Sequence, residues 1–313
     1  MGTAMTETFG LILTILGLIF AFESPRRLFI GLFRKNIPTD FLAQASENWI
    51  ARLNAAFSGE VQIYCQTSKE PVLHIEGEYQ LTDLQKEDAT KQREVLRHEG
   101  RPNDMHAILV EEPTWQATPV HMRVQTIDYA GIIALRNEGR RPQVLSSGAL
   151  ILSRELGQIL LHRRGTNVAW YSSHLHIFGG GYMPPSNQGR DDGKSLRATA
   201  EREVLEETKL SLPPEAAPPM ILAKEITTGF IQLVYLGFDV PATAVSRVNG
   251  NWEGYMEAVP YEALPGLLQQ PGWVPSGKAH VLAWLALGAP GCGERPPFGG
   301  LAPDQLFNVC VEV

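Results

Sequence analysis

The sequence has few cysteines and no excess of positive charge. Its three cysteines among 313 residues are Cys65, Cys292 and Cys310, and no two of them form a CxxC pair. Cysteines that are odd in number and far apart in the sequence indicate neither a disulfide framework nor a zinc cluster. A reducing compartment is therefore the simpler interpretation. The net charge of -7 leaves no general basic surface for gripping nucleic acid, and nucleic acid is therefore not expected as a partner.

Long charged runs and internal repeats are missing as well. Hydrophobic residues make up 44% of the chain and charged residues 19%. This composition excludes a disordered tail, a collagen repeat and a long coiled coil. The length is enough for about two domains of ordinary size, so the chain is expected to be globular with more than one part.

The most apolar stretch of the chain lies at residues 8–22, which carry no formal charge. As a helix rising about 1.5 Å per residue, fifteen residues would cover roughly 22 Å, which is short of the ~30 Å hydrocarbon core. A span would need snorkelling ends or local thinning of the bilayer. We expect residues 1–36 to form a membrane anchor with one hydrophobic helix, and a buried or partner-docked helix is the alternative.

The charges around this stretch predict its orientation. All basic residues among the first 35 follow the stretch, beginning with Arg26. The positive-inside bias would place the N-terminus outside and the rest of the chain in the cytoplasm, as a single-pass membrane protein. Gly17 and Ala21 form a small-xxx-small pair that would let two such helices touch, which would permit a homo-oligomer.

The remainder divides into three segments. Residues 40–142 mix helix and strand signals and are expected to form a small α+β domain of unknown role. A basic stretch with Gly and Pro, residues 136–142, suggests the boundary. Residues 145–288 begin with two apolar strands that read as a hairpin and continue through a glycine-rich segment and a strong helix. Residues 289–313 are rich in Pro and Gly and are expected to be a surface extension.

The most informative segment is a predicted helix over residues 195–210. Glu203, Glu206 and Glu207 stand at i, i+3 and i+4, so three carboxylates share one helical face. Like charges at i and i+4 cost a few tenths of a kcal/mol, and local stability therefore does not ask for this arrangement. A hard divalent cation with oxygen ligands would relieve the repulsion. The alternative is a solvated charged face.

This helix resembles the signature of the Nudix hydrolase family, which is Gly, five residues, Glu, seven residues, then Arg-Glu-aliphatic-x-Glu-Glu-x-Gly-aliphatic. The matching core is Arg202, Glu203, Val204, Leu205, Glu206 and Glu207. The resemblance extends from about residue 146 to about residue 287 and includes paired arginines and a Gly-Gly turn.

Three features depart from the signature. Lys209 stands where the family usually has Gly, and Lys194 stands where the first Glu of the signature would be. Twenty-one residues separate Gly180 from Arg202, eight more than in the signature, so the loop before the helix is enlarged.

The resemblance implies a fold and an activity. The fold would be an α/β/α sandwich with a mixed sheet over residues 145–288. The activity would be Mg²⁺- or Mn²⁺-dependent hydrolysis of a pyrophosphate bond in a nucleoside diphosphate linked to another moiety, with a nucleotide-type small molecule as substrate. The departures keep open a Nudix-like sensor that binds a nucleotide without turnover. An isomerase of prenyl diphosphates is a third alternative, although its expected Cys has no clear counterpart.

The resemblance also implies roles for the acidic residues of the helix. Glu203, Glu206 and Glu207 would bind the metal, together with a backbone carbonyl at Gly180. Glu203 and Glu206 would be catalytic, with Glu203 as the general base for water. Arg202, also counted with the catalytic residues, would orient a carboxylate rather than touch substrate.

Other candidates lie outside the helix. Family members commonly add a fourth carboxylate from a later strand or loop, for which Glu253 is the first candidate and Glu257 the second. Arg163 and Arg164 would contact a phosphate, although alternation along a strand lets only one of them face the site. His176, beside the glycine turn, is the remaining candidate for contact with substrate, and an ordinary hydrogen-bonded histidine is its alternative.

Overall fold

The structure is a computed structural model that describes residues 48–168, 170–185, 191–245, 250, 253–293 and 298–311. The chain divides into two compact units, Met1–Asn48 and Trp49–Val313. The expected anchor at residues 1–36 lies outside the described residues and stays a prediction. Within the described ranges, every helix is too short or too polar to traverse a bilayer.

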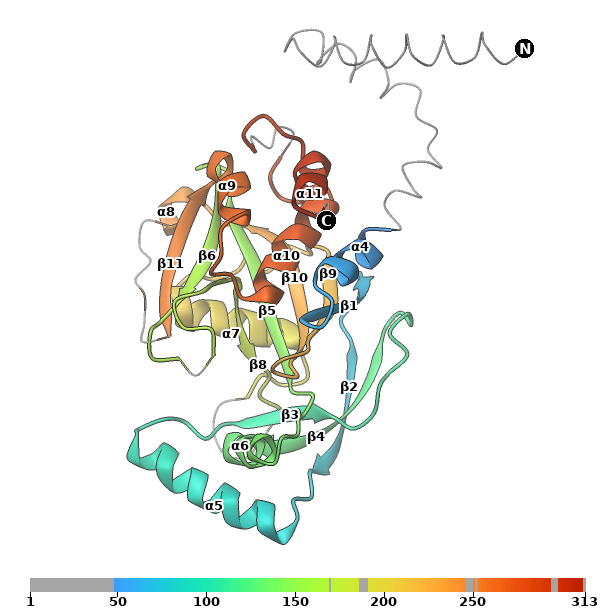
Figure 1. The fold of residues 1–313 in the computed structure, drawn as a ribbon, viewed down its shortest axis with the longest axis vertical. Helices are drawn as coiled ribbons and strands as arrows, with labels where there is room; N and C mark the ends of the chain where they lie inside the picture. Colours follow the sequence, from blue (N-terminus) through green and yellow to red (C-terminus); the bar gives the residue numbers. More distant parts are fainter. Residues whose placement is uncertain are drawn as a thin grey trace, which may run out of the picture. The chain divides into compact units, whose positions relative to one another are not determined.

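A mixed sheet forms the centre of the unit Trp49–Val313. Its strands run in the order β1–β9–β10–β5–β6–β11, with β7 paired to β6 and β8 paired to β5 (Figure 1). Only the β10–β5 pair is parallel among these neighbours; the other pairs are antiparallel. The bounds are β1 Val61–Thr67, β5 Leu145–Ser153, β6 Gln158–Arg164, β7 Leu175–His176, β8 Phe178–Gly181, β9 Met220–Glu225, β10 Ile231–Asp239 and β11 Gly254–Pro260.

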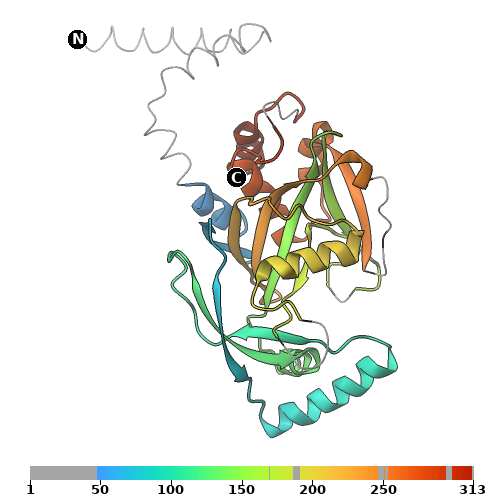
Figure 2. The same ribbon diagram turned by 180° about the vertical axis from the view of Figure 1, so that it is seen from behind.

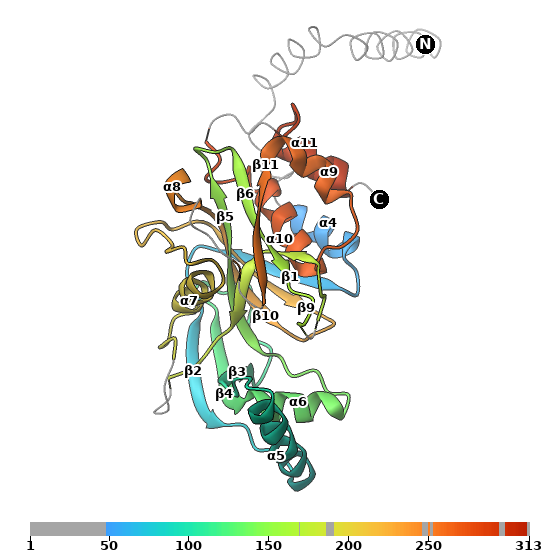
Figure 3. The same cartoon turned by 90° about the vertical axis from the view of Figure 1, so that its left-hand side faces the viewer.

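Helices cover both faces of this sheet. The helix α7 (Leu196–Thr208) crosses one face, and α4 (Trp49–Ala56), α10 (Pro275–Ala286) and α11 (Pro303–Val311) cover the other (Figures 2 and 3). Every residue of β5 is buried, because a central strand covered on both faces has no side toward water. The predicted α/β fold with a mixed sheet is therefore confirmed. Three short elements complete the set, α8 Ala242–Val245, the 3₁₀ helix η1 Tyr261–Ala263 and α9 Leu264–Leu268.

A second, smaller sheet has the strand order β2–β4–β3. Its strands are β2 (Val72–Glu78), β3 (Met105–Leu109) and β4 (His121–Asp128), and two helices accompany them, α5 (Asp83–His98) and α6 (Tyr129–Asn137). We refer to residues 72–137 as the small module. The α5 helix begins at a capping box in which Thr82 and Gln85 satisfy each other's backbone N–H groups.

The structure differs from the expected domain boundaries in two places. The strand β1 belongs to the main sheet, where Val61 pairs with Glu225 of β9, and so the main fold begins well before residue 145. Residues 289–313 were expected to be a surface extension, yet Phe298, Leu306 and Phe307 are buried in the main core, and α11 packs against α10 and α4. Pro and Gly shape the backbone of this segment, but its apolar side chains decide where it packs.

Candidate functional site

The helix α7 is built by local signals at both ends. At its start, the Ser195 side chain accepts hydrogen bonds from the backbone N–H groups of Arg197 and Ala198, at 3.1 and 3.3 Å. At its end, Lys209 adopts a left-handed conformation with φ of 63° and donates its backbone N–H to the Leu205 carbonyl at 2.9 Å. Lysine thus occupies a cap position that favours glycine, so this departure from the signature changes the residue but not the end of the helix.

Glu203 points from α7 at the glycine strand β8. A side chain at Gly180 would collide with the Glu203 carboxylate, so only glycine permits this approach. Arg202 donates a hydrogen bond from Nη1 to Glu203 Oε1 at 2.7 Å. Burial raises the pKa of Glu203 to about 7; Arg202 opposes that rise, and the carboxylates of Glu207 and Glu253 add to it. This carboxyl therefore changes protonation state near neutral pH.

Glu207 is the most enclosed of the three glutamates, with 4% of its side chain exposed. Its Oε2 accepts a hydrogen bond from the Gly179 N–H at 3.2 Å, and its Oε1 lies 3.0 Å from His162 Nδ1. His162 comes from β6 and stacks on the Phe178 ring. Sequence reasoning missed this histidine, although strand alternation places it on the same face of β6 as Arg164.

Glu206 and Glu253 complete the acidic set. The Glu206 side chain is 39% exposed, and one of its carboxylate oxygens lies 3.7 Å from Arg202 Nη1. Glu253 directly precedes β11 and lines the same cavity as the three glutamates of α7. The second candidate, Glu257, lies elsewhere, because it forms an ion pair with Arg163 at 2.8 Å.

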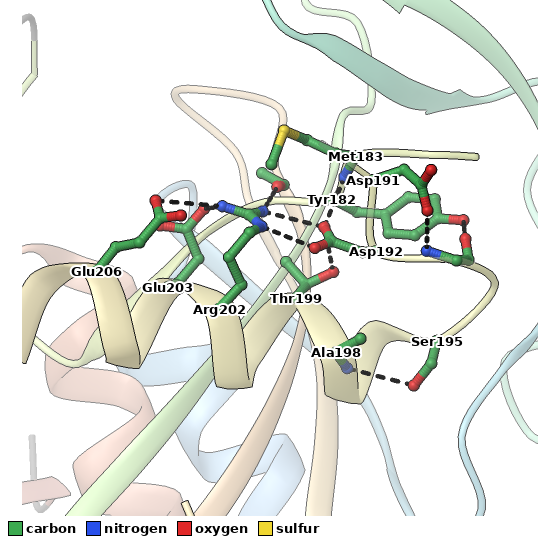
Figure 4. Close-up of polar contacts among 12 residues, drawn as sticks. Tyr182, Met183, Asp191, Asp192, Ser195, Ala198, Thr199, Arg202, Glu203 and Glu206 are labelled. Atoms are coloured by element: carbon green, nitrogen blue, oxygen red, sulfur yellow. Dashed lines mark hydrogen bonds and ion pairs between the residues drawn. The ribbon is translucent and has the colours of Figure 1, made fainter. Parts of the chain in front are cut away.

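A buried aspartate holds Arg202 in place (Figure 4). Arg202 donates from Nε to Asp192 Oδ1 at 2.7 Å and from Nη2 to Asp192 Oδ2 at 3.0 Å, and it also donates to the Gly181 carbonyl at 2.9 Å. The Asp192 side chain is 2% exposed and accepts further hydrogen bonds from the Met183 N–H and the Thr199 hydroxyl. The guanidinium therefore bridges this aspartate and Glu203.

Asp192 also bears on the departure at Lys194, which stands where the signature has its first Glu. Lys194 stands eight positions before Arg202, where an acidic residue was expected, whereas Asp192 stands ten positions before it. In this chain the acid that pairs with Arg202 is Asp192. The only sequence signal was the acidic pair Asp191–Asp192 ahead of the helix.

Arg202 and the four glutamates line one cavity of about 460 Å³. The glycine strand, Arg164 and His176 contribute to its wall together with the four glutamates. Arg164 donates to the Trp170 carbonyl at 3.1 Å, and among the described residues it forms no ion pair. His176 contacts the Ile177 carbonyl through Nδ1 at 2.6 Å and the Ser276 hydroxyl through Nε2 at 3.2 Å, so both ring nitrogens have partners within the protein.

The donor set suits a hard divalent cation in its chemistry. Four carboxylates and a glycine carbonyl are the oxygen ligands that Mg²⁺ or Mn²⁺ takes. The pKa of Glu203 is raised chiefly by burial, and the neighbouring carboxylates of Glu207 and Glu253 add a smaller part, which such a cation would offset. Within the described part of the chain, no three acidic, histidine or cysteine side chains have the spacing of ligands to a single ion. Arg202 and His162 hold two of the carboxylates in hydrogen bonds instead.

Comparison with known proteins gives a limited likeness. No family model and no curated protein matches the sequence. Among solved structures, the chain is similar to the MutT protein from Methanosarcina mazei Go1, with 26% identity over 43% of this chain and 88% of that chain and a TM-score of 0.32. It is also similar to the NUDIX domain of Shewanella oneidensis NrtR complexed with ADP ribose, with 15% identity, 51% and 97% coverage and a TM-score of 0.34.

A third similar structure is a bifunctional NMN adenylyltransferase/ADP ribose pyrophosphatase from Francisella tularensis. The identity is 14%, the likeness covers 49% of this chain and 45% of that chain, and the TM-score is 0.35. Likenesses at these TM-scores do not assign the chain to a family. The functional conclusion therefore has to come from the residues of the cavity.

Proposed function

We propose that the chain is a metal-dependent hydrolase that cleaves a pyrophosphate bond in a nucleoside diphosphate linked to another moiety. One observation supports this above the others. Glu203, Glu206 and Glu207 of α7 line a single cavity with Glu253, against the glycine strand β8. Clustered carboxylates in a cleft are suited to metal-assisted hydrolysis and are costly to maintain without such a role.

The metal would be held by these four carboxylates together with the Gly180 carbonyl. When bound, Mg²⁺ or Mn²⁺ would supply the positive charge that a diphosphate requires and that this acidic protein lacks overall.

The residues of the chain have separate tasks in this proposal. Glu203 takes the proton from the attacking water, because its carboxylate lines the cavity against the glycine strand, where the water would be activated. Arg202, fixed by Asp192, holds the Glu203 carboxylate in one orientation. Arg164 binds a phosphate oxygen, and the glycines of β8 let the diphosphate approach the backbone closely. Arg163, paired with Glu257, takes no part.

The alternative is a sensor that binds a nucleotide without turnover, an idea that rests on the departures at Lys194 and Lys209. Asp192 pairs with Arg202, and Lys209 ends the helix in a left-handed turn. Neither departure disturbs the face that carries the glutamates, which favours the enzyme.

The test is hydrolysis by the full-length chain of a panel of dinucleotides, sugar nucleotides and nucleoside triphosphates. We expect product from at least one compound with Mg²⁺ and none after EDTA is added, and Glu206→Gln and Glu207→Gln should each abolish it. Nucleotide binding without product from any compound would support the sensor and contradict the enzyme.

We also propose that residues 8–22 tether the chain to a membrane, with the N-terminus outside and the catalytic part in the cytoplasm. The support is the uncharged stretch and the basic residues that follow it. Full-length protein should sediment with membranes and require detergent for extraction. Its recovery in the supernatant without detergent would contradict the tether.

A further inference from the structure

The cavity has a second wall that the proposed mechanism does not use. Arg101, His106, Tyr129 and Arg136 of the small module line this wall, and Thr228 and Phe230 of the main fold face the same space. The module therefore contributes directly to the cavity that holds the glutamates.

Arg136, in the last turn of α6, is a half-buried cation in this wall. Its Nη2 donates to the Thr228 carbonyl at 3.1 Å, and its guanidinium lies 5.5 Å from the centre of the Phe230 ring. Among the described residues it forms no ion pair, unlike Arg202, whose charge is matched by Asp192. Burial lowers the pKa of Arg136, as expected for a cation that has lost water without gaining a counter-ion. Such a group is a natural partner for an anion.

His106 connects this wall to the acidic end of the cavity. Its ring packs so closely on β8 that a side chain at Gly181 would collide with it. The charges of Arg202 and Arg136 both act on this ring. Burial lowers the pKa of His106 to about 4, so the ring is neutral near pH 7.

The free nitrogen of His106 adds a polar group to the wall. Its Nδ1 is buried and has no hydrogen-bond partner among the described residues, while the ring makes a hydrogen bond to the Tyr182 backbone. A neutral imidazole has a single N–H, and when that proton serves the backbone, Nδ1 is left as an acceptor for a hydroxyl. Asp104 also lines the wall, but among the described residues it forms no ion pair with Arg136, so the guanidinium charge is left for an anionic group of the ligand.

We propose that Arg136 and His106 form a second subsite, which binds a phosphate ester on a sugar of the substrate, away from the bond that is cleaved. Arg136 binds the phosphate, and His106 accepts a hydrogen bond from a neighbouring hydroxyl of the sugar. This inference rests on the proposed function, because the ligand is a substrate only if the chain is a hydrolase. It narrows the substrate class to a nucleoside diphosphate conjugate that carries one additional phosphate.

The experiment measures binding without turnover. Full-length protein in EDTA is titrated by calorimetry with AMP and with adenosine 2′,5′- and 3′,5′-bisphosphate, which differ from AMP by one phosphate. We expect at least one bisphosphate to bind about tenfold or more tightly than AMP, as a charge-assisted hydrogen bond to phosphate allows. Arg136→Met should remove this preference, and its thermal melt should match that of the wild type, which shows that the variant is folded.

Arg140→Met is the matched control. Arg140 follows the same helix and also lies over an aromatic ring, that of Tyr79 at 5.9 Å, but it does not line the cavity. It should keep the full preference. The subsite is contradicted if the wild type binds AMP and both bisphosphates equally, or if Arg136→Met retains the preference.

This experiment is independent of the proposed activity. A preference that depends on Arg136, in a protein that hydrolyses nothing in the panel, would support the subsite and overturn the hydrolase. Hydrolysis of a compound in the panel, without a preference for a bisphosphate, would support the hydrolase and overturn the subsite. With an active enzyme, the same variant should lower kcat/KM for NADP⁺ relative to NAD⁺, or for coenzyme A relative to its dephospho form, since each pair differs by one sugar phosphate.

Discussion

Replacing Glu203 by Gln should lower kcat by about 10²- to 10⁴-fold, the range that a general base contributes. The amide has nearly the shape of the carboxyl but cannot take a proton from water. The fold should tolerate the change, because the buried carboxyl already has its pKa raised to about 7 and a neutral group costs less to bury. Steady-state hydrolysis of the best substrate in the panel measures the rate, and a thermal melt checks the fold.

Glu201→Gln is the matched control for this change. Glu201 lies on the same helix, pairs with Arg197 at 2.6 Å and is absent from the lining of the cavity. The Glu201 side chain is 44% exposed, and Arg197 keeps its hydrogen bonds to the Ala216 and Pro213 carbonyls after the change. The rate should therefore stay near that of the wild type, and the melting temperature should fall only slightly. A Glu203→Gln protein that keeps the wild-type rate would remove Glu203 from the role of base.

Asp192→Asn should destabilise the fold by about 3 to 5 kcal/mol, the usual result of removing one partner from a buried ion pair. Arg202 would lose the buried carboxylate that accepts two of its hydrogen bonds, and it would keep only Glu203 and the more distant Glu206 as counter-ions. The amide has only one acceptor oxygen, so it could not accept all the hydrogen bonds that Asp192 now accepts from Arg202, the Met183 N–H and the Thr199 hydroxyl. Urea unfolding measures the loss, and kcat should fall too, because Arg202 no longer fixes Glu203.

The neighbouring aspartate supplies the control for that substitution. Asp191 accepts a hydrogen bond from the Gly193 N–H at 3.0 Å and lies in an exposed position. Its change to Asn should alter the free energy of unfolding by no more than about 0.5 kcal/mol, as for most surface substitutions. Equal stability of Asp192→Asn and the wild type would mean that the Arg202–Asp192 pair is not buried in solution.

Prediction from sequence worked best where the information is local. The helix over residues 195–210 was expected from its period, and the structure places α7 at Leu196–Thr208. The common face of its three glutamates follows from that period alone. The apolar hairpin strands likewise became β5 and β6, because unbroken runs of apolar residues are typical of buried strands.

Prediction was weaker where a feature depends on partners distant in the chain. The strand β1 joins the main sheet by pairing with β9, in which Val61 lies opposite Glu225. The local sequence of a strand does not indicate which distant strand it will pair with. The Pro- and Gly-rich end of the chain was expected at the surface for its composition. Its Leu306 and Phe307 are buried because α11 packs against the apolar side chains of α4 and α10.

The spacing of residues was enough to predict the helix and its acidic face, because positions along one helix follow from its period without help from the rest of the chain. The packing of separate elements accounts for the approach of Glu203 to Gly180, for the contacts of Asp192 with Arg202 and of His162 with Glu207, and for the part of the cavity wall that Arg136 and His106 supply from the small module. These contacts join separate elements, so they exist only once the sheet, the enlarged loop and the module have packed together.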